Sequence, residues 1–274
     1  MKSHTLLGDK KFLIVVLFFF ILSIWWAWLN FFDPSVTSNK LQLWAALYQV
    51  VALYGAIVGF YISHLWGGHR SIMGKAVLAF SIGLLLQSFG QSVYSYYIFY
   101  EQIEIPYPSV GDIGFFGSIP MYIYGITMIA MAAGAKFSMK RYLSSKLQLL
   151  ILPIGMLIFS YSIFLSDYNF SGVSFTKVFL DFGYPLGQAF YVSLAILAFS
   201  LTRHFLGGIM HGPVLFLIFA LIAQYLSDFT FLYQAAHGIW SAGGFNDFMY
   251  LTSYSLMATA LIYIGDTFHN LKHA

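Results

Sequence analysis

Long apolar stretches alternate with short polar connections along the whole chain. A helix needs about 20 apolar residues to cross a hydrocarbon core of roughly 30 Å. The stretches of this kind are 12–32, 41–66, 76–100, 113–135, 147–166, 178–202, 212–235 and 248–265. They predict an all-α, polytopic transmembrane helical bundle of eight spans that forms one domain over residues 1–274. The last stretch is the shortest, so a seven-span bundle with the C terminus on the opposite side is the alternative.

Composition agrees with lipid as the main partner of the chain. Charged residues make up 8% of the sequence, the hydrophobic fraction is 59% and the mean hydropathy is +0.77. A typical soluble domain has about 25% charged residues. The first stretch ends in bulky residues such as Trp25 and Trp26 without a cleavage signal, which favours a retained helix over a signal peptide. The absence of cysteine excludes thiolate nucleophiles and cysteine-ligated metals.

Lysine and arginine indicate the orientation, because they concentrate on the cytoplasmic side of membrane proteins. If the N terminus is cytoplasmic, only Lys40 and Lys177 fall on the external side. The cytoplasmic segments then hold Lys2, Lys10, Lys11, Arg70, Lys75, Lys136, Lys140, Arg141, Lys146, Arg203 and Lys272. The sequence therefore predicts a multi-pass protein of the cell membrane with both termini in the cytoplasm.

The two halves of the chain carry similar residues in the same order. The matched pairs are His64 with His204, Gln87 with Gln224, Gln91 with Asp228, Tyr96 with Tyr233, and Asp112 with Asp247. An offset of four spans preserves topology, so these pairs predict parallel repeats over 1–140 and 141–274, related by an axis along the membrane normal. Coincidence in a biased composition is the alternative reading.

Asp228 is the most informative candidate for a ligand-binding residue, because it lies inside the seventh predicted span. A carboxylate at such depth costs a few kcal/mol unless it is paired, protonated or hydrated. No lysine or arginine occurs at its depth, so its expected neighbours are uncharged, such as Gln91 and Gln224. A neutral acid that only holds helices together is the structural alternative.

Further acids and tyrosines gather toward the predicted external face. Asp112, Asp181 and Asp247 each lie at or near the start of an even-numbered span and are followed by aromatic residues. Together with Tyr96 and Tyr233 they predict an acid- and tyrosine-lined pocket for a cationic or flat aromatic ligand. Helix capping by the acids and an interfacial aromatic belt are the alternatives.

Other chemistry has weaker signals in the sequence. His64 and His204 suggest a bis-histidine haem site, although both lie near the cytoplasmic ends of their spans. The sequence contains no His-Glu-x-x-His, Gly-x-Ser-x-Gly or P-loop pattern. We therefore expect neither an enzyme, nor a metal site, nor a nucleic-acid partner, and the sequence names no cofactor.

Three short motifs resemble those of a known class of membrane regions. They are Pro106-Tyr-Pro108-Ser109-Val-Gly-Asp112, Asp181-Phe-Gly-Tyr184-Pro185 and Gly244-Phe-Asn-Asp247. Similar motifs occur in the multi-span N-terminal sensor regions that precede GGDEF diguanylate cyclase and histidine kinase modules. The resemblance implies sensing without naming a signal. It departs from the pattern because no output module follows the last span. We therefore expect either an excised or free-standing sensor, or a likeness that reflects only a shared membrane fold.

Three functions follow from these observations. The leading hypothesis is a sensor or receptor that binds a small molecule in the outer half of the bundle and signals to a cytoplasmic protein. The second is a secondary transporter or proton-coupled carrier that uses Asp228 between the two halves. The third is a haem-binding electron-transfer subunit.

Overall fold

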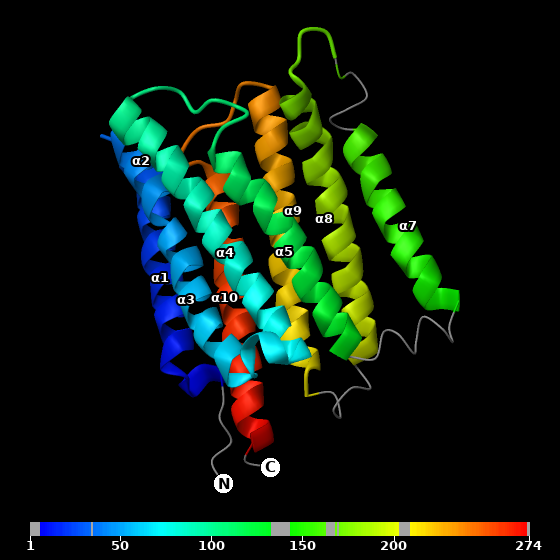
Figure 1. The fold of residues 1–274 in the computed structure, drawn as a ribbon. Coiled ribbons are helices and arrows are strands. Elements are labelled where there is room, and N and C mark those ends of the chain that lie inside the picture. The colour runs from blue at the N-terminus through cyan, green and yellow to red at the C-terminus, as the bar shows by residue number, and fades with distance from the viewer. Residues whose placement is uncertain are drawn as a thin grey trace.

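The computed structural model is a bundle of long helices (Figure 1) and describes residues 6–33, 35–132, 143–162, 168, 170–202 and 209–272. Within these ranges there is no β-strand. The helices are α1 (Lys10–Ala27), α2 (Ser38–Leu47), α3 (Gln49–Leu65), α4 (Ile72–Tyr96), α5 (Gly111–Ala132), α7 (Leu143–Ser160), α8 (Phe175–Thr202), α9 (His211–Ala236) and α10 (Phe245–Lys272). Single π-helical turns extend α1 over Trp28–Phe32 and α4 over Tyr97–Glu101. His204 and the predicted cytoplasmic cations Lys2, Lys136, Lys140, Arg141 and Arg203 lie outside the described residues.

Seven helical segments in the described chain are long and apolar enough to cross a membrane. They are α1 with its π turn, α2 together with α3, α4, α5, α8, α9 and α10. The prediction of a multi-pass membrane helical bundle is thereby confirmed. α7 corresponds to the fifth predicted span, 147–166, of which residues 163–166 lie outside the described part. The second predicted span is divided into α2 and α3 at Tyr48.

Six helices form a closed ring. Around it, α3 contacts α4, α4 contacts α5, α5 contacts α8, α8 contacts α9, α9 contacts α10, and α10 returns to α3. Outside the ring, α1 packs against α10 and α7 packs against α8 (Figure 1). The sequences α3–α4–α5 and α8–α9–α10 thus occupy equivalent halves of the ring. This is the helix order that a parallel repeat requires; a superposition of the halves remains a prediction.

Glycines let α4 and α5 approach each other closely. A Cβ atom on Gly90 would lie 2.8 Å from the Phe115 ring, and a Cβ atom on Gly111 would lie 2.8 Å from the Tyr94 ring. Small residues are the usual means by which membrane helices bring their backbones together. Here the close approach fixes the rings of Tyr94 and Phe115 at the end of the bundle where the candidate site lies.

α10 is the most deeply buried of the seven candidate spans, although the sequence suggested that it was the weakest. It is 28 residues long, and 72% of its apolar window is buried. Its polar side chains lower its hydropathy but find partners inside the bundle. Asn246 donates to the Ser227 carbonyl at 2.6 Å, and Tyr254 donates to Gln87 Oε1 at 2.9 Å. The structure therefore favours retaining the last span.

Both termini lie at one end of the bundle (Figure 1), which we call the terminal end. The connections at 97–110 and 237–244 lie at the opposite, distal end. Among the described cationic residues, Lys10, Arg70, Lys75 and Lys272 belong to segments at the terminal end, whereas Lys40 and Lys177 belong to segments at the distal end.

A candidate ligand-binding chamber

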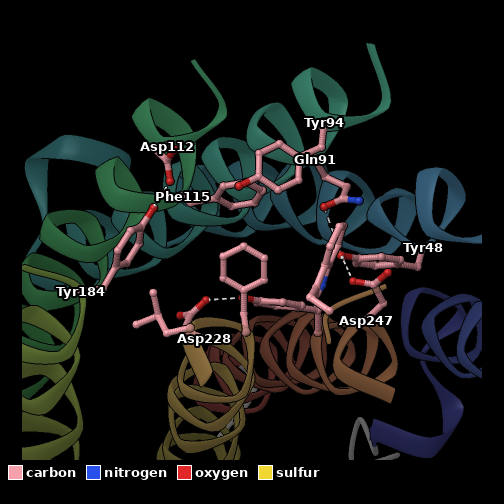
Figure 2. A pocket seen from close by; sticks show the side chains of 12 residues that line it. Tyr48, Gln91, Tyr94, Asp112, Phe115, Tyr184, Asp228 and Asp247 are labelled. Carbon is pink, nitrogen blue, oxygen red and sulfur yellow. Dashed lines mark hydrogen bonds between the residues drawn. The ribbon is translucent and has the colours of Figure 1, made fainter. Parts of the chain in front are cut away.

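A cavity lies inside the ring at its distal end, and Figure 2 shows the side chains around it. Its volume is about 30 Å³, which is room for about two water molecules. All six ring helices or their adjoining turns contribute to it. The lining residues are Tyr48, Gln91, Tyr94, Asp112, Phe115, Tyr184, Asp228, Phe231, Leu232, Trp240, Asp247 and Tyr250. We call this cavity the chamber; it brings together three buried carboxyl groups and seven aromatic rings.

Asp228 faces the bundle interior, as the sequence predicted. Its Oδ2 atom accepts hydrogen bonds from Gln188 Nε2 at 2.6 Å and from Gln224 Nε2 at 3.0 Å. Its Oδ1 atom accepts from the Tyr250 hydroxyl at 2.6 Å (Figure 2). The side chain is therefore held by three uncharged donors from α8, α9 and α10, with 8% of its surface exposed.

Asp112 and Asp247 have matching surroundings at the starts of α5 and α10. One oxygen of each accepts a backbone N–H just before or at the helix start: Ser109 N at 2.7 Å for Asp112, and Gly243 N at 2.7 Å for Asp247. The other oxygen faces a tyrosine hydroxyl of a neighbouring helix or turn. Tyr184 donates to Asp112 at 2.9 Å, and Tyr48 lies 3.5 Å from Asp247. Helix capping accounts for one oxygen of each carboxyl group, while the other faces the chamber.

The chamber is lined by pairs of residues at nearly the repeat offset. The pairs are Tyr48 with Tyr184, Gln91 with Asp228, Tyr94 with Phe231, Asp112 with Asp247, and Phe115 with Tyr250. Below the chamber, Gln87 donates to Ser118 at 2.8 Å, and Ser253 donates to Gln224 at 3.0 Å in the corresponding place. Two half-sites with similar residues therefore face each other. They differ at the pair in which Gln91 corresponds to the acid Asp228.

Among the described residues, no lysine or arginine lines the chamber. Lys11 pairs with Asp9 and Lys40 pairs with Asp33, and neither ion pair involves a chamber residue. Asp33 lies outside the spans, where hydrogen bonds from Lys40 and then from Ser35 lower its pKa from 3.8 to about 2. The chamber carboxyl groups have only neutral hydrogen-bond donors, so the arrangement suits a cation that reaches them from outside.

The remaining predicted site residues lie around the chamber or away from it. Gln224 supports Asp228 from below. Asp181 is separate and accepts hydrogen bonds from Tyr107 and Tyr168, each at 2.7 Å. Burial, followed by the hydrogen bond to Asp181, raises the pKa of Tyr168 to about 12.

Tyr96 and Tyr233 do not contribute to the chamber. They are 48% and 40% exposed, respectively. The Tyr96 hydroxyl donates to Glu101 at 2.7 Å, and the Tyr233 ring packs on His237 with their centroids 4.2 Å apart. We therefore leave both tyrosines out of the candidate site.

Sequence reasoning did not single out Tyr48, Tyr184, Gln188, Tyr250 or Trp240 as site residues. A signal for two of them was present, because Tyr184 follows Tyr48 by 136 positions, close to the offset of the other matched pairs. The run Asp247-Phe-Met-Tyr250 also placed Tyr250 one helical turn from an acid. Gln188 was a polar residue within a predicted span.

A larger cavity, the vestibule, adjoins the chamber at the distal end. Its volume is about 1100 Å³, and its lining includes Ser38, Gln42, Gln102, Glu104 and Tyr107. Tyr94, Phe231 and Trp240 line both cavities. These three aromatic side chains therefore lie between the chamber and the vestibule.

The described residues do not include both histidines of the predicted haem site. His64 is exposed at the terminal end of α3, and its predicted partner His204 lies outside the described part. Within that part, no group of three histidine, aspartate or glutamate side chains could hold a metal ion.

Comparison with known proteins adds no assignment: no family model, curated protein or solved structure matches this chain.

Proposed function

We propose that this protein is a membrane receptor that binds a small organic cation in the chamber. One observation supports this: Asp112, Asp228 and Asp247 are all buried around one cavity, and its lining, in the part of the chain that the structure describes, includes no lysine or arginine. A buried carboxyl group is unfavourable in its charged form unless a cation compensates it. A ligand that carries the positive charge would supply that compensation.

The aromatic lining supports an organic cation over a bare metal ion. Tyr48, Tyr94, Tyr184 and Tyr250 line the chamber together with Phe115, Phe231 and Trp240. Aromatic rings attract ammonium groups through the negative faces of their π systems, by about 0.5–1 kcal/mol at exposed sites and about 2 kcal/mol when desolvated. The small volume favours a compact headgroup, which the chamber can accommodate only if its side chains move apart.

A sensor explains the architecture in one further respect. α10 carries Asp247 and Tyr250 in the chamber and continues without interruption to Lys272 at the terminal end. A ligand that displaces the start of α10 can thus shift its end, where we propose that a signalling protein binds. The motif resemblance to multi-span sensor regions supports the same class. With both termini cytoplasmic, the chamber would open toward the external side.

A secondary transporter is the second candidate, and the two related half-sites favour it. Substrates of many carriers bind between internal repeats near the middle of the membrane. The chamber instead lies at one end of the ring, beside a vestibule on the same side. One-sided access is the arrangement expected of a receptor, so we rank the transporter second.

The test is ligand-dependent stabilisation of the purified protein. The probes are tetramethylammonium, choline and ethanolammonium, with 3,3-dimethylbutan-1-ol as the uncharged analogue of choline. At 100 times its dissociation constant a ligand stabilises the folded state by about 2.7 kcal/mol. We expect at least one ammonium compound to raise the unfolding temperature, no effect of the neutral alcohol, and loss of the effect in Asp228→Asn. Asp33→Asn, which removes a carboxylate outside the chamber, is the control.

Two outcomes would count against the proposal. Stabilisation by the neutral alcohol equal to that by choline would show that charge is not recognised. Stabilisation that survives in Asp228→Asn, Asp112→Asn and Asp247→Asn alike would place binding elsewhere. The cation that binds could instead accumulate inside proteoliposomes with the wild-type protein and not inside those with Asp228→Asn. That result would identify the protein as a transporter rather than a receptor.

A further inference from the structure

The chamber and the vestibule are separated by three aromatic side chains, which we call the aromatic gate: Tyr94, Phe231 and Trp240. Tyr94 and Phe231 are a repeat-related pair on α4 and α9, while Trp240 lies in the connection between α9 and α10. A molecule of the proposed ligand class is larger than the space for about two waters inside the chamber. Entry from the vestibule therefore requires at least one gate residue to move.

Tyr94 is held firmly in its place. It is 6% exposed, and its ring packs edge-on against Phe115 with centroids 5.0 Å apart. Gly111 of α5 lies directly behind the ring, so close that a Cβ atom there would come within 2.8 Å of it. Displacing Tyr94 would require α4 and α5 to separate, and close-packed helices resist that.

Trp240 has much weaker attachments. Its ring meets Phe231 edge-on with centroids 5.8 Å apart. Its Nε1 atom is buried and has no hydrogen-bond acceptor among the described residues. A buried donor without an acceptor costs about 1–3 kcal/mol, so the closed position of the indole is not stabilised by its polar atom.

Two glycines in left-handed turns bound the segment that carries Trp240. Gly238 and Gly243 flank it with φ angles of 66° and 76°, in the left-handed region that favours glycine. Gly243 is anchored, because its carbonyl accepts from Trp26 Nε1 at 2.9 Å and its N–H donates to Asp247 at 2.7 Å. The segment that carries Trp240 therefore has its α10 end anchored, and its other end joins α9 at a glycine rather than at a residue with a side chain.

We propose that Trp240 is the moving part of the aromatic gate and controls passage between the vestibule and the chamber. Outward rotation of its indole opens the chamber toward the distal end and brings Nε1 to the polar vestibule, where it can find an acceptor. The same connection reports on occupancy, because Gly243 donates to Asp247, a carboxyl group that a bound cation would engage. This inference rests on the proposed function only for the identity of what passes the gate.

The experiment measures access with a thiol reagent and needs no ligand, since the chain contains no cysteine. Gln91→Cys places a single thiol in the chamber, and Ser38→Cys places one in the vestibule. The probe is the trimethylammonium derivative of ethyl methanethiosulfonate, a cation whose reaction with a thiol depends on access to the sulfur. Each cysteine variant is labelled with Trp240 present and in the Trp240→Ala background. Trp28→Ala makes the same change at an exposed tryptophan near the distal end and is the matched control.

With Trp240 present, the thiol at position 91 should react at least about tenfold more slowly than the thiol at position 38, because access limits the reaction. Trp240→Ala should accelerate labelling at position 91 by at least about tenfold and leave position 38 within about twofold. Trp28→Ala should change neither rate. If Gln91→Cys does not fold, Phe115→Cys supplies the chamber thiol.

Equal labelling rates at positions 91 and 38 with Trp240 in place would contradict the proposal that Trp240 gates the chamber. So would an unchanged rate at position 91 after Trp240→Ala, or equal acceleration by Trp28→Ala. These results are distinct from a failure of the proposed function. A gated chamber that binds none of the ammonium probes would retain the labelling pattern and lose only the ligand-dependent stabilisation.

Discussion

Replacing Asp228 by asparagine or by leucine separates the shape of this side chain from its hydrogen bonding. Asparagine can keep all three contacts. Its oxygen can accept from both Gln188 and Gln224, as Oδ2 does now, and its amide can donate to the Tyr250 hydroxyl. Leucine has a similar size and leaves all three donors without an acceptor.

The structure sets the size of the expected difference. Hydrogen bonds between membrane helices contribute about 0.6 kcal/mol on average and up to about 1.7 kcal/mol each. Two of the three lost bonds, those from Gln188 and Tyr250, join α9 to other helices, and the bond from Gln224 lies within α9. The two interhelical bonds predict that Asp228→Leu lowers the free energy of unfolding by about 1–3 kcal/mol. Asp228→Asn should remain within about 1 kcal/mol of the wild type, because it removes the charge and keeps the bonds.

The assay is reversible unfolding of the purified protein in mixed detergent micelles, followed by circular dichroism. Thr230→Val on the same helix is the control, because its hydroxyl makes an exposed hydrogen bond to the Leu226 carbonyl within the helix. A loss of stability in Asp228→Asn as large as that in Asp228→Leu would refute the reasoning. It would mean that the charge itself holds the fold and that Asp228 is not available to a ligand.

Three further predictions concern topology, packing and charge. Reporter fusions at the C terminus and in the connection 101–110 should report opposite sides of the membrane; a shared side would contradict the orientation. Gly90→Ala should destabilise the protein by about 1–3 kcal/mol by overpacking, whereas Gly155→Ala, which has no atom within 4 Å of its new Cβ, should not. Hydrogen bonds from Lys40 and then from Ser35 lower the pKa of Asp33 to about 2, so these contacts stabilise the fold above about pH 4 and lose this effect as the pH falls toward 2. In Lys40→Met, carboxyl NMR should find this pKa raised but still below 3.8, because the Ser35 bonds remain; an unchanged value would contradict the ion pair.

The fold was predictable because lipid imposes a simple length and polarity rule on each helix. The same rule made the last span look the weakest, although α10 is deeply buried. Interior polar residues such as Asn246 and Tyr254 lower its hydropathy, and they find hydrogen-bond partners only in the assembled bundle. Hydropathy averages over a helix and does not distinguish a lipid-facing polar residue from an interior one.

A candidate site residue was predictable from the sequence where its depth in the membrane determines that it faces the interior. It was less predictable where its angular position around the helix axis determines which side it faces. Asp228 had to face inward on energetic grounds. Tyr96 lies five residues after Gln91, which turns it by about 140° away on a helix of 3.6 residues per turn, while Tyr94 lies only about 60° away. Tyr94 and Phe231 therefore line the chamber in place of Tyr96 and Tyr233. The position of Trp240 depends on how one connection folds over the ring, which no periodicity encodes.

The occupancy of the chamber is the most direct test of its proposed role. Native mass spectrometry of the protein extracted gently from its own membrane would weigh any bound molecule, whatever its chemical identity. We predict a small adduct on the wild type that dissociates as a cation and is lost in the combined variant Asp112→Asn, Asp228→Asn, Asp247→Asn. An adduct retained by that variant, or a wild-type protein that carries only lipid, would contradict a cation-binding chamber.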